Sequence, residues 1–308
     1  MNELHKPVLL KEVIDGLNIK SDGVYLDLTL GRAGHSSEIL KRLKTGLLIG
    51  VDQDIEAIEY SQTRLAAISD KFTLVRSNFV NIDEILENLK ISKVDGILMD
   101  LGVSSPQFDD VSRGFSYRFD SELDMRMDQR NELTAKRIVN KYSLDELVKV
   151  FNEYGEEKYS YSIAKNIVKQ REIAPINTTF ELVEIIKRSK PSKELKKVGH
   201  PAKQVFQALR IEVNDEINVL KRTLTKALNH LNPGGRLAVI TFHSGEDKIV
   251  KHLFKELTVV EGNRYDLPLQ NQNVEYRLIT RKGIKPSESE IGENHRSVSS
   301  TLRIIEKI

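Results

Sequence analysis

The chain has 308 residues, enough for one large domain or two ordinary ones with a substantial core. It contains no cysteine, which excludes disulfides, thiolate zinc sites, iron–sulfur clusters and cysteine nucleophiles. No apolar run approaches the roughly 18 residues of a membrane span, and no signal peptide is recognisable, so we expect a cytoplasmic protein with no membrane partner. The net charge of +2, in a chain that is 30% charged, points to no partner by itself.

One stretch of the chain is locally basic. Between Lys187 and Lys203, seven lysines and arginines accompany a single acid, Glu194. A phosphate-facing surface and a solvated, lysine-rich loop explain this composition equally well.

Strands and helices alternate over the first third of the chain. Apolar runs predict buried strands, at residues 24–30, 47–52, 72–75 and 94–101. Amphipathic spacing predicts the helices between them, at residues 36–43, 54–65 and 82–89. This alternation is typical of a parallel sheet with helices on both faces.

The alternation stops after Pro106, and no buried strand is predicted before about His200. Helix starts appear instead, at Ser143 with Glu146 and at Thr178 with Glu181, both with the spacing of a capping box. We therefore predict an inserted all-helical domain over residues 107–202.

The α/β pattern resumes with apolar residues at helical spacing from 205 to 231, which predict one long helix ended by the breaker at residues 232–235. A strand at 236–242, a helix at 246–257 capped by Ser244 with Asp247, and final strands at 276–280 and 302–305 follow. The predicted α/β domain thus comprises residues 1–106 and 203–308.

The turn after the first strand carries Gly31 and Gly34, which allow close backbone approach to a ligand. Asp52 closes the second strand, where a carboxylate can accept both hydroxyls of an adenosine ribose. The glycine spacing does not fit the G-x-G-x-x-G pattern that holds a dinucleotide pyrophosphate. S-adenosylmethionine has no phosphates and needs no such cradle. Taken singly, the glycines fit a turn without a ligand, and Asp52 fits a helix N-cap.

The next two strands also end in polar or aromatic residues. Phe79 follows the third strand, where it could flank adenine or simply pack in the core. The fourth strand ends in a turn over residues 100–107 that brings an acid, two hydroxyls and an amide together beside the expected methyl donor.

Several long motifs make the sequence closely similar to one family. They lie at residues 5–10, 31–35, 52–54, 100–107, 113–117, 123–128, 154–157, 200–202, 205–211, 232–236 and 242–244. Over nearly its whole length the chain resembles the bacterial ribosomal small-subunit RNA cytosine-N4 methyltransferases. The resemblance implies a Rossmann-like class I methyltransferase sheet with an inserted helical domain.

The resemblance also implies an activity. It is methyl transfer from S-adenosylmethionine to N4 of the cytidine at position 1402, in the P-site region of 16S rRNA within the small ribosomal subunit. Including Gly31 from the glycine turn, the implied cofactor contacts are Gly31, Ala33, Gly34, His35, Asp52, Phe79, Asp100 and Gln107. No metal is implied.

The chain departs from the family pattern in places. Ala33 stands where the family usually has glycine, and Gly245 and Lys248 replace its usual residues after the fifth main-sheet strand. The segment before the last strand is also less basic than usual. These departures concern RNA contact near the C-terminus more than cofactor binding.

The exocyclic N4 of cytosine is a poor nucleophile, so an acceptor for its amino hydrogens would help the transfer. Asp100 is the first candidate by position, and Ser104, its neighbour Ser105 and His243 are alternatives. His243 could instead orient the helix that follows it.

The expected contacts to RNA are basic side chains of the insertion and of the helix after it: Arg113, Arg118, Lys203 and Arg210. For Arg126 we favour an internal ion-pair network, and for Phe115 and Tyr117 base stacking and core packing are equally supported. The oligomeric state stays open, with a homodimer as one option. Two other functions remain: a non-catalytic RNA-binding assembly factor, and a methyltransferase of another substrate.

Overall fold

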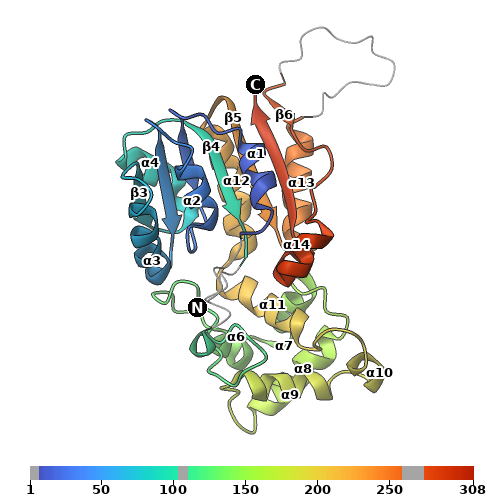
Figure 1. Ribbon diagram of the computed structural model, residues 1–308. Coiled ribbons are helices and arrows are strands. Elements are labelled where there is room, and N and C mark those ends of the chain that lie inside the picture. Colours follow the sequence, from blue (N-terminus) through green and yellow to red (C-terminus); the bar gives the residue numbers. More distant parts are fainter. Residues whose placement is uncertain (1–6, 103–109, 259–273) are drawn as a thin grey trace, which may run out of the picture. The chain divides into compact units, whose positions relative to one another are not determined.

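The computed structural model describes residues 7–102, 110–258 and 274–308 (Figure 1). The chain forms two compact units. One comprises residues 1–102 and 218–308, and the other comprises residues 103–217. Each is described by itself below.

The first unit contains a seven-stranded sheet. Its strands are β1 (Val24–Asp27), β2 (Leu47–Asp52), β3 (Phe72–Arg76), β4 (Val94–Asp100), β5 (Leu231–Thr241), β6 (Tyr276–Leu278) and β7 (Thr301–Lys307). Their order is β3-β2-β1-β4-β5-β7-β6; β1 to β5 are parallel, and β7 runs antiparallel to both of its neighbours. This is the sheet of the Rossmann-like class I methyltransferase fold, and the predicted fold class is confirmed.

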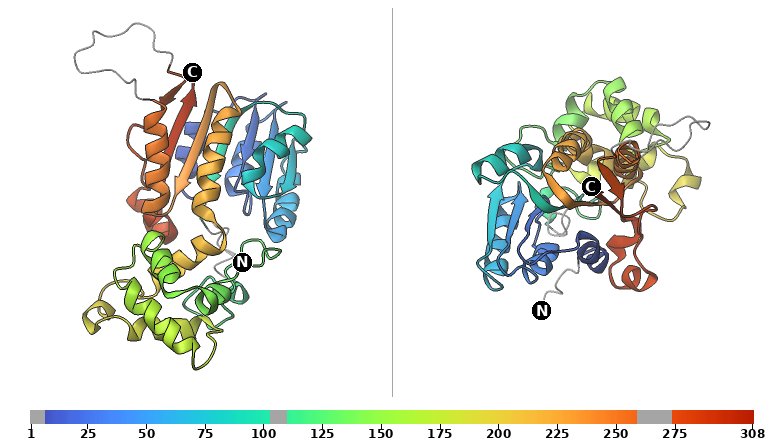
Figure 2. Two further views of the ribbon diagram at one scale, coloured as in Figure 1. Left: turned by 180° about the vertical axis from the view of Figure 1, so that it is seen from behind. Right: turned by 90° about the horizontal axis from the view of Figure 1, so that it is seen from above.

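Helices cover both faces of this sheet, as the view from above shows (Figure 2). On one face lie α1 (Leu10–Leu17), α2 (Gly34–Leu40) and α3 (Ile55–Ala66); on the other lie α4 (Ile82–Asn88), α12 (Glu216–Asn229) and α13 (Ser244–Glu256). Successive strand residues face opposite cores, so that Leu48 packs with the first set and Ile49 with the second. Helix α14 (Glu288–Glu293) precedes β7.

The second unit is helical. It contains the short helix η2 (Val111–Arg113) and helices α6 (Ala135–Lys141), α7 (Leu144–Glu153), α8 (Ser160–Arg171), α9 (Thr179–Arg188), α10 (Ser192–Leu195) and α11 (Lys203–Val213). Both predicted capping boxes are confirmed, at the starts of α7 and α9. None of the described helices in either unit is long and apolar enough to span a membrane.

The long helix predicted over 205–231 is wrong, because the chain breaks it at Asn214 and Asp215, the latter with a φ of 50°. The Asn214 side chain accepts from the Met127 N–H at 2.8 Å and donates to the Met125 carbonyl at 2.9 Å, so it ties the end of α11 to a loop of the helical unit. Helix α11 also buries Phe206 and Leu209 in the helical core. The boundary between the units therefore follows α11 instead of preceding it.

Two smaller predictions about the end of the α/β pattern also fail. The segment 232–235 does not simply separate a helix from a strand: β5 starts at Leu231, and these residues form an irregularity within it, with Gly234 at a φ of 76°. Helix α13 is capped by His243 with Glu246, not by Ser244 with Asp247, because the backbone becomes helical at Ser244 itself.

Candidate active site

Three carboxylates lie at one edge of the sheet, each at the end of a strand. Asp27 ends β1, Asp52 ends β2 and Asp100 ends β4, and these three strands are neighbours in the order β2-β1-β4. Parallel strands end on the same side, where open α/β sheets bind their ligands. Asp52 and Asp100 were expected from the sequence, whereas Asp27 was not, because the predicted first strand extended to residue 30 and placed Asp27 in its interior.

Asp52 is held by the backbone around it. Its Oδ2 accepts from the Gly31 N–H at 2.8 Å, and its Oδ1 accepts from the Asp54 N–H at 2.9 Å. Burial is the largest influence on this carboxyl and raises its pKa to about 6, against the lowering effect of the two N–H groups. The alternative role as helix N-cap is not observed, because Asp54 accepts from Glu56 and caps α3.

Backbone conformation and packing within the protein explain why the turn after β1 contains glycines. Gly31 has a φ of 50°, and Ala33 adopts the same left-handed region at 55° although it carries a side chain. At Gly34 a Cβ would come within 2.5 Å of the Pro7 ring, so close packing alone demands glycine there. The turn therefore brings Gly31 beside Asp52 and starts α2 at Gly34.

Asp100 faces His35, the residue that follows the turn. The His35 Nδ1 lies 3.6 Å from the Asp100 Oδ2, and the His35 Nε2 lies 2.9 Å from the Val8 carbonyl. Since a carbonyl can only accept, Nε2 carries the hydrogen and Nδ1 is the atom turned to the carboxyl group. Among the described residues, the buried Oδ1 of Asp100 has no hydrogen-bond partner.

The surroundings of Asp100 favour its protonated form. Burial, followed by the negative charges of Asp27 and Glu246, raises the pKa of Asp100 well above its usual range. The backbone N–H of Asp100 donates to the Thr29 hydroxyl at 2.6 Å, which fixes the end of β4 against the turn after β1. A strongly perturbed carboxyl group of this kind at a sheet edge is typical of an active site.

His243 lies just past the end of β5 and is held by the start of α13. Its Nε2 is 3.1 Å from Oε1 of Glu246, whose Oε2 accepts from the Phe242 N–H at 2.8 Å. This geometry fits the helix-orienting role of His243. Glu246 is buried and acts on Asp100 electrostatically. It was not predicted from the sequence, since its proximity to Asp100 arises only when β4 pairs with β5.

Phe79 begins the short helix η1 (Phe79–Asn81) and packs, partly buried, against the core on the α4 face of the sheet. Beside it, the Asn78 amide donates to the Gln53 side chain at 3.2 Å and links the ends of β2 and β3. Core packing thus accounts for part of the Phe79 side chain. The candidates Ser104 and Gln107, with Ser105, lie outside the described residues.

In the helical unit, two of the four arginines and lysines expected to contact RNA have structural partners instead. Arg113 is buried and donates to the Arg126 and Met127 carbonyls at 3.0 and 3.1 Å. Arg210 pairs with Glu216 through two hydrogen bonds of 2.8 and 2.9 Å. Both guanidinium groups are thus engaged within the protein, and their contact with RNA stays a prediction. Arg118 and Lys203 are exposed.

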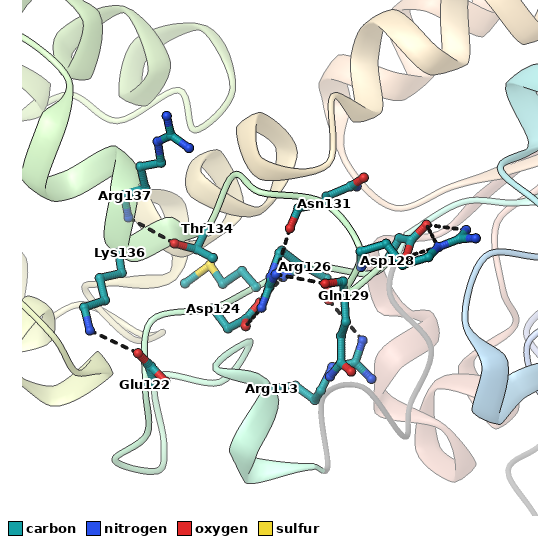
Figure 3. A network of polar contacts seen from close by, with 12 residues as sticks. Arg113, Glu122, Asp124, Arg126, Asp128, Gln129, Asn131, Thr134, Lys136 and Arg137 are labelled. Carbon is teal, nitrogen blue, oxygen red and sulfur yellow. Dashed lines mark hydrogen bonds and ion pairs between the residues drawn. The ribbon is translucent and has the colours of Figure 1, made fainter.

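Arg126 forms the internal network that the sequence favoured (Figure 3). Its guanidinium group donates to both oxygens of Asp124, at 2.8 and 2.6 Å, and to the Gln129 and Asn131 carbonyls, at 2.9 and 2.7 Å. One side chain therefore shapes the loop that leads into α6.

Comparisons with known proteins assign the whole chain to one family. The family model described as the MraW methylase family matches residues 2–308. The chain belongs to this family. Curated relatives in it are 54% identical over 99% of both chains in Mesoplasma florum and 53% identical over 99% of this chain and 98% of the other in Exiguobacterium sibiricum.

Both relatives carry the name ribosomal RNA small subunit methyltransferase H, as does a protein of Lachnospira eligens that is 51% identical over 99% of this chain and 98% of its own. These identities extend over the sheet unit and the helical unit alike. The match to the MraW family therefore includes both the sheet unit, with its three carboxylates, and the helical unit.

Proposed function

We propose that the protein methylates N4 of the cytidine at position 1402, in the P-site region of 16S rRNA, with S-adenosylmethionine as methyl donor. The observation that carries this proposal is the identity of 51 to 54% over 99% of the chain with proteins named as ribosomal RNA small subunit methyltransferases. The three carboxylates at the end of β1, β2 and β4 supply a matching site.

Asp52 is the residue placed to hold the ribose of the cofactor. Each of its carboxylate oxygens accepts one backbone N–H and keeps a second lone pair for a ribose hydroxyl. The turn of Gly31, Ala33, Gly34 and His35 borders the methionine part, and Phe79 flanks the adenine. Gln107 is the further contact expected from the sequence.

S-adenosylmethionine supplies a methyl group that is already activated on a sulfonium. The protein has to align N4 with it and to accept the amino hydrogens, an effect of alignment that can reach about 7 to 11 kcal/mol. Asp100 has an oxygen, Oδ1, without a partner among the described residues, which suits an acceptor for the N4 amino group. His35 Nδ1 faces the other oxygen at 3.6 Å. Because burial favours the protonated form of Asp100, the group accepts the amino hydrogen through Oδ1, and the proton released from N4 passes to water. Ser104 and His243 are the alternative acceptors.

The acceptor nucleotide has to leave its stack to reach such a site. The exposed Arg118 and Lys203 of the helical unit are the remaining RNA contacts. The substrate is the assembled or nearly assembled small subunit in the cytoplasm, and the protein acts there as a monomer or a homodimer.

The test uses small subunits that lack the modification, incubated with the protein and cofactor labelled on its methyl group. Digestion of the RNA to nucleosides should yield labelled N4-methylcytidine. Cofactor binding without labelled RNA would contradict the proposal and favour an assembly factor or another substrate.

Replacement of Asp100 tests its role within this reaction. We expect Asp100→Ala to bind the cofactor and to lose transfer by about 10²- to 10³-fold, the usual cost of removing a group that stabilises developing charge. Glu59, an exposed acid on α3, provides the matched control as Glu59→Ala, which should transfer at the normal rate. An unchanged rate in Asp100→Ala would remove Asp100 from the chemistry.

A further inference from the structure

Three rings form a series in the helical unit that leads from its core to its surface. Phe206 of α11 is buried and meets Tyr117 edge to face, with ring centroids 5.6 Å apart. Tyr117, only partly buried, stacks on His200 with centroids 4.3 Å apart and planes at 9°. His200 is thus the outermost ring, on a support that the core keeps rigid.

The imidazole of His200 is held in one orientation and one tautomer. Its Nδ1 accepts from the Ala202 N–H at 3.2 Å, so in the neutral ring the hydrogen is on Nε2. Partial burial, then the positive charges of Lys187, Arg118 and Lys190, lower the pKa of His200 and keep the ring neutral. A neutral flat ring with one donor at its rim is well suited to stack on a nucleobase.

Cations lie around this pair of rings. Lys190 is committed to Glu157 at 2.6 Å and to the Pro201 carbonyl, and Lys187 pairs with Glu184 at 2.8 Å. Arg118 follows Tyr117 directly, and the Lys203 N–H donates to the His200 carbonyl at 3.0 Å. Both side chains are exposed, and none of the ion pairs among the described residues involves either of them. The charge of Arg118 therefore lies close enough to act on His200, and Lys203 is joined to His200 through its backbone. Both side chains are available to an anion.

Rings next to unpaired cations are the combination that single-stranded nucleic acid requires, because bases stack on the rings while phosphates meet the charges. An acidic peptide would use the charges and leave the rings without a role. We infer that the Tyr117–His200 pair, with Arg118 and Lys203, is a stacking platform for an unpaired nucleotide of the substrate RNA. The inference rests on the proposed function, which makes RNA the substrate.

The platform also gives a role to the basic stretch around it. Residues 187–203 end beside His200, and most of their charged side chains are exposed. A strand whose base lies on His200 would run its phosphates past this stretch. Of the two explanations that the composition left open, the phosphate-facing one then applies to the end near Lys203.

The experiment measures binding of the full-length protein to a single-stranded oligoribonucleotide that carries the fluorescent base 2-aminopurine. Stacking should quench the fluorescence. We expect His200→Ala to weaken binding about tenfold, in line with the loss of one stacked base, and His200→Phe to stay within about twofold of the unmodified protein. The matched control is His252→Ala, which removes a histidine that is 75% exposed on α13 and should change nothing.

The charges are tested through the salt dependence of the same binding. Lys203→Ala and Arg118→Ala should each lower the slope of log affinity against log salt by about 0.7, the value for one phosphate contact on a single strand. Melting temperatures show whether each variant folds, and His200→Leu replaces His200→Ala if the latter does not.

Equal binding by His200→Ala and by the unmodified protein, or equal competition by polyglutamate and RNA, would overturn the platform. Because binding is read without methyl transfer, its outcome is separate from that of the nucleoside assay. On small subunits, His200→Ala should raise KM for the subunit about tenfold with kcat unchanged; a loss confined to kcat would contradict a binding role.

Discussion

Both carboxylate oxygens of Asp52 already accept a backbone N–H from within the protein, and yet the pKa of this group is raised to about 6. Burial explains this, since removal from water penalises the charged form more than two N–H groups favour it. At the residue scale, Asp52 is therefore a group that titrates close to physiological pH. The same burial raises the pKa of the neighbouring Asp27.

Cofactor affinity should consequently depend on pH. A ribose hydroxyl donates more strongly to the ionised carboxylate, so a protonated Asp52 has to lose its proton when the cofactor binds. With a pKa of about 6, we expect the affinity for S-adenosylmethionine, measured by calorimetry, to be about tenfold lower at about pH 5 than at about pH 7.5. Asp52→Asn should bind weakly at both values. A tenfold change that persists in this variant would assign the effect to another group.

The pKa of Asp52 has a second effect, on stability. Because the folded-state value lies above the unfolded one, the carboxyl group contributes fully below the unfolded pKa, and the contribution is lost as pH rises through about 6. The free energy of unfolding of the ligand-free protein should therefore fall as the pH rises through about 6, and it should fall less in Asp52→Asn.

At the scale of elements, helix starts were predictable where one local pair can form the cap and were misplaced where two pairs compete. Ser143 with Glu146 and Thr178 with Glu181 lie three residues apart, and the structure has both boxes. At α13 the same spacing occurs twice, in His243 with Glu246 and in Ser244 with Asp247. Asp247 pairs instead with Arg303 of β7 at 2.8 Å, a partner far away in sequence that no local pattern reveals.

The cap of α9 can be tested directly. The Thr178 hydroxyl accepts from the Glu181 N–H at 3.3 Å, and Glu181 accepts from the Thr178 N–H at 3.1 Å. Thr178→Ala should lower the free energy of unfolding by about 1 kcal/mol in urea titrations, whereas Thr178→Ser should retain most of it. If alanine and serine have the same effect, the hydroxyl is not the stabilising group.

The same distinction between local and distant partners explains which features of the site could be predicted from the sequence. The placement of Gly31, Asp52 and Asp100 at one end of the sheet was predictable because strand ends and turns are local features. Their roles toward the cofactor stay predictions. The internal partners of Arg113 and Arg210, two loop carbonyls and Glu216, were not predicted, because no sequence pattern shows which acceptors a guanidinium group meets in the folded unit. Glu246 was missed because its proximity to Asp100 depends on the pairing of β4 with β5.

At the scale of the whole molecule, the two units have separate hydrophobic cores: one in the helical unit and one on each face of the sheet. Phe151 is fully buried in the helical core, and Phe254 is 2% exposed in the core on the α4 face of the sheet. Within the described residues, the sheet unit and the helical unit each bury their own large side chains. Stability should accordingly be a property of each unit.

Hydrogen exchange measured peptide by peptide tests whether each unit has its own stability. Phe151→Ala should remove about 3 to 5 kcal/mol of protection from α7, α8 and α9 while the strands stay protected, and Phe254→Ala should give the reverse pattern. S-adenosylmethionine should protect β1, β2 and β4 alone. Uniform acceleration in both variants would mean that the chain unfolds as one cooperative body.

Strands β4 and β5 are hydrogen-bonded neighbours, but the whole helical unit and α12 lie between them in the chain. During synthesis, β4 therefore leaves the ribosome with one edge unpaired, and at about 5–20 residues per second the insertion alone delays β5 by roughly ten seconds. An unpaired strand edge invites aggregation. An insertion that folds on its own meanwhile replaces a long flexible loop by a compact one and lowers the entropy cost of the late pairing. The order in which the chain is made thus favours early folding of the helical unit.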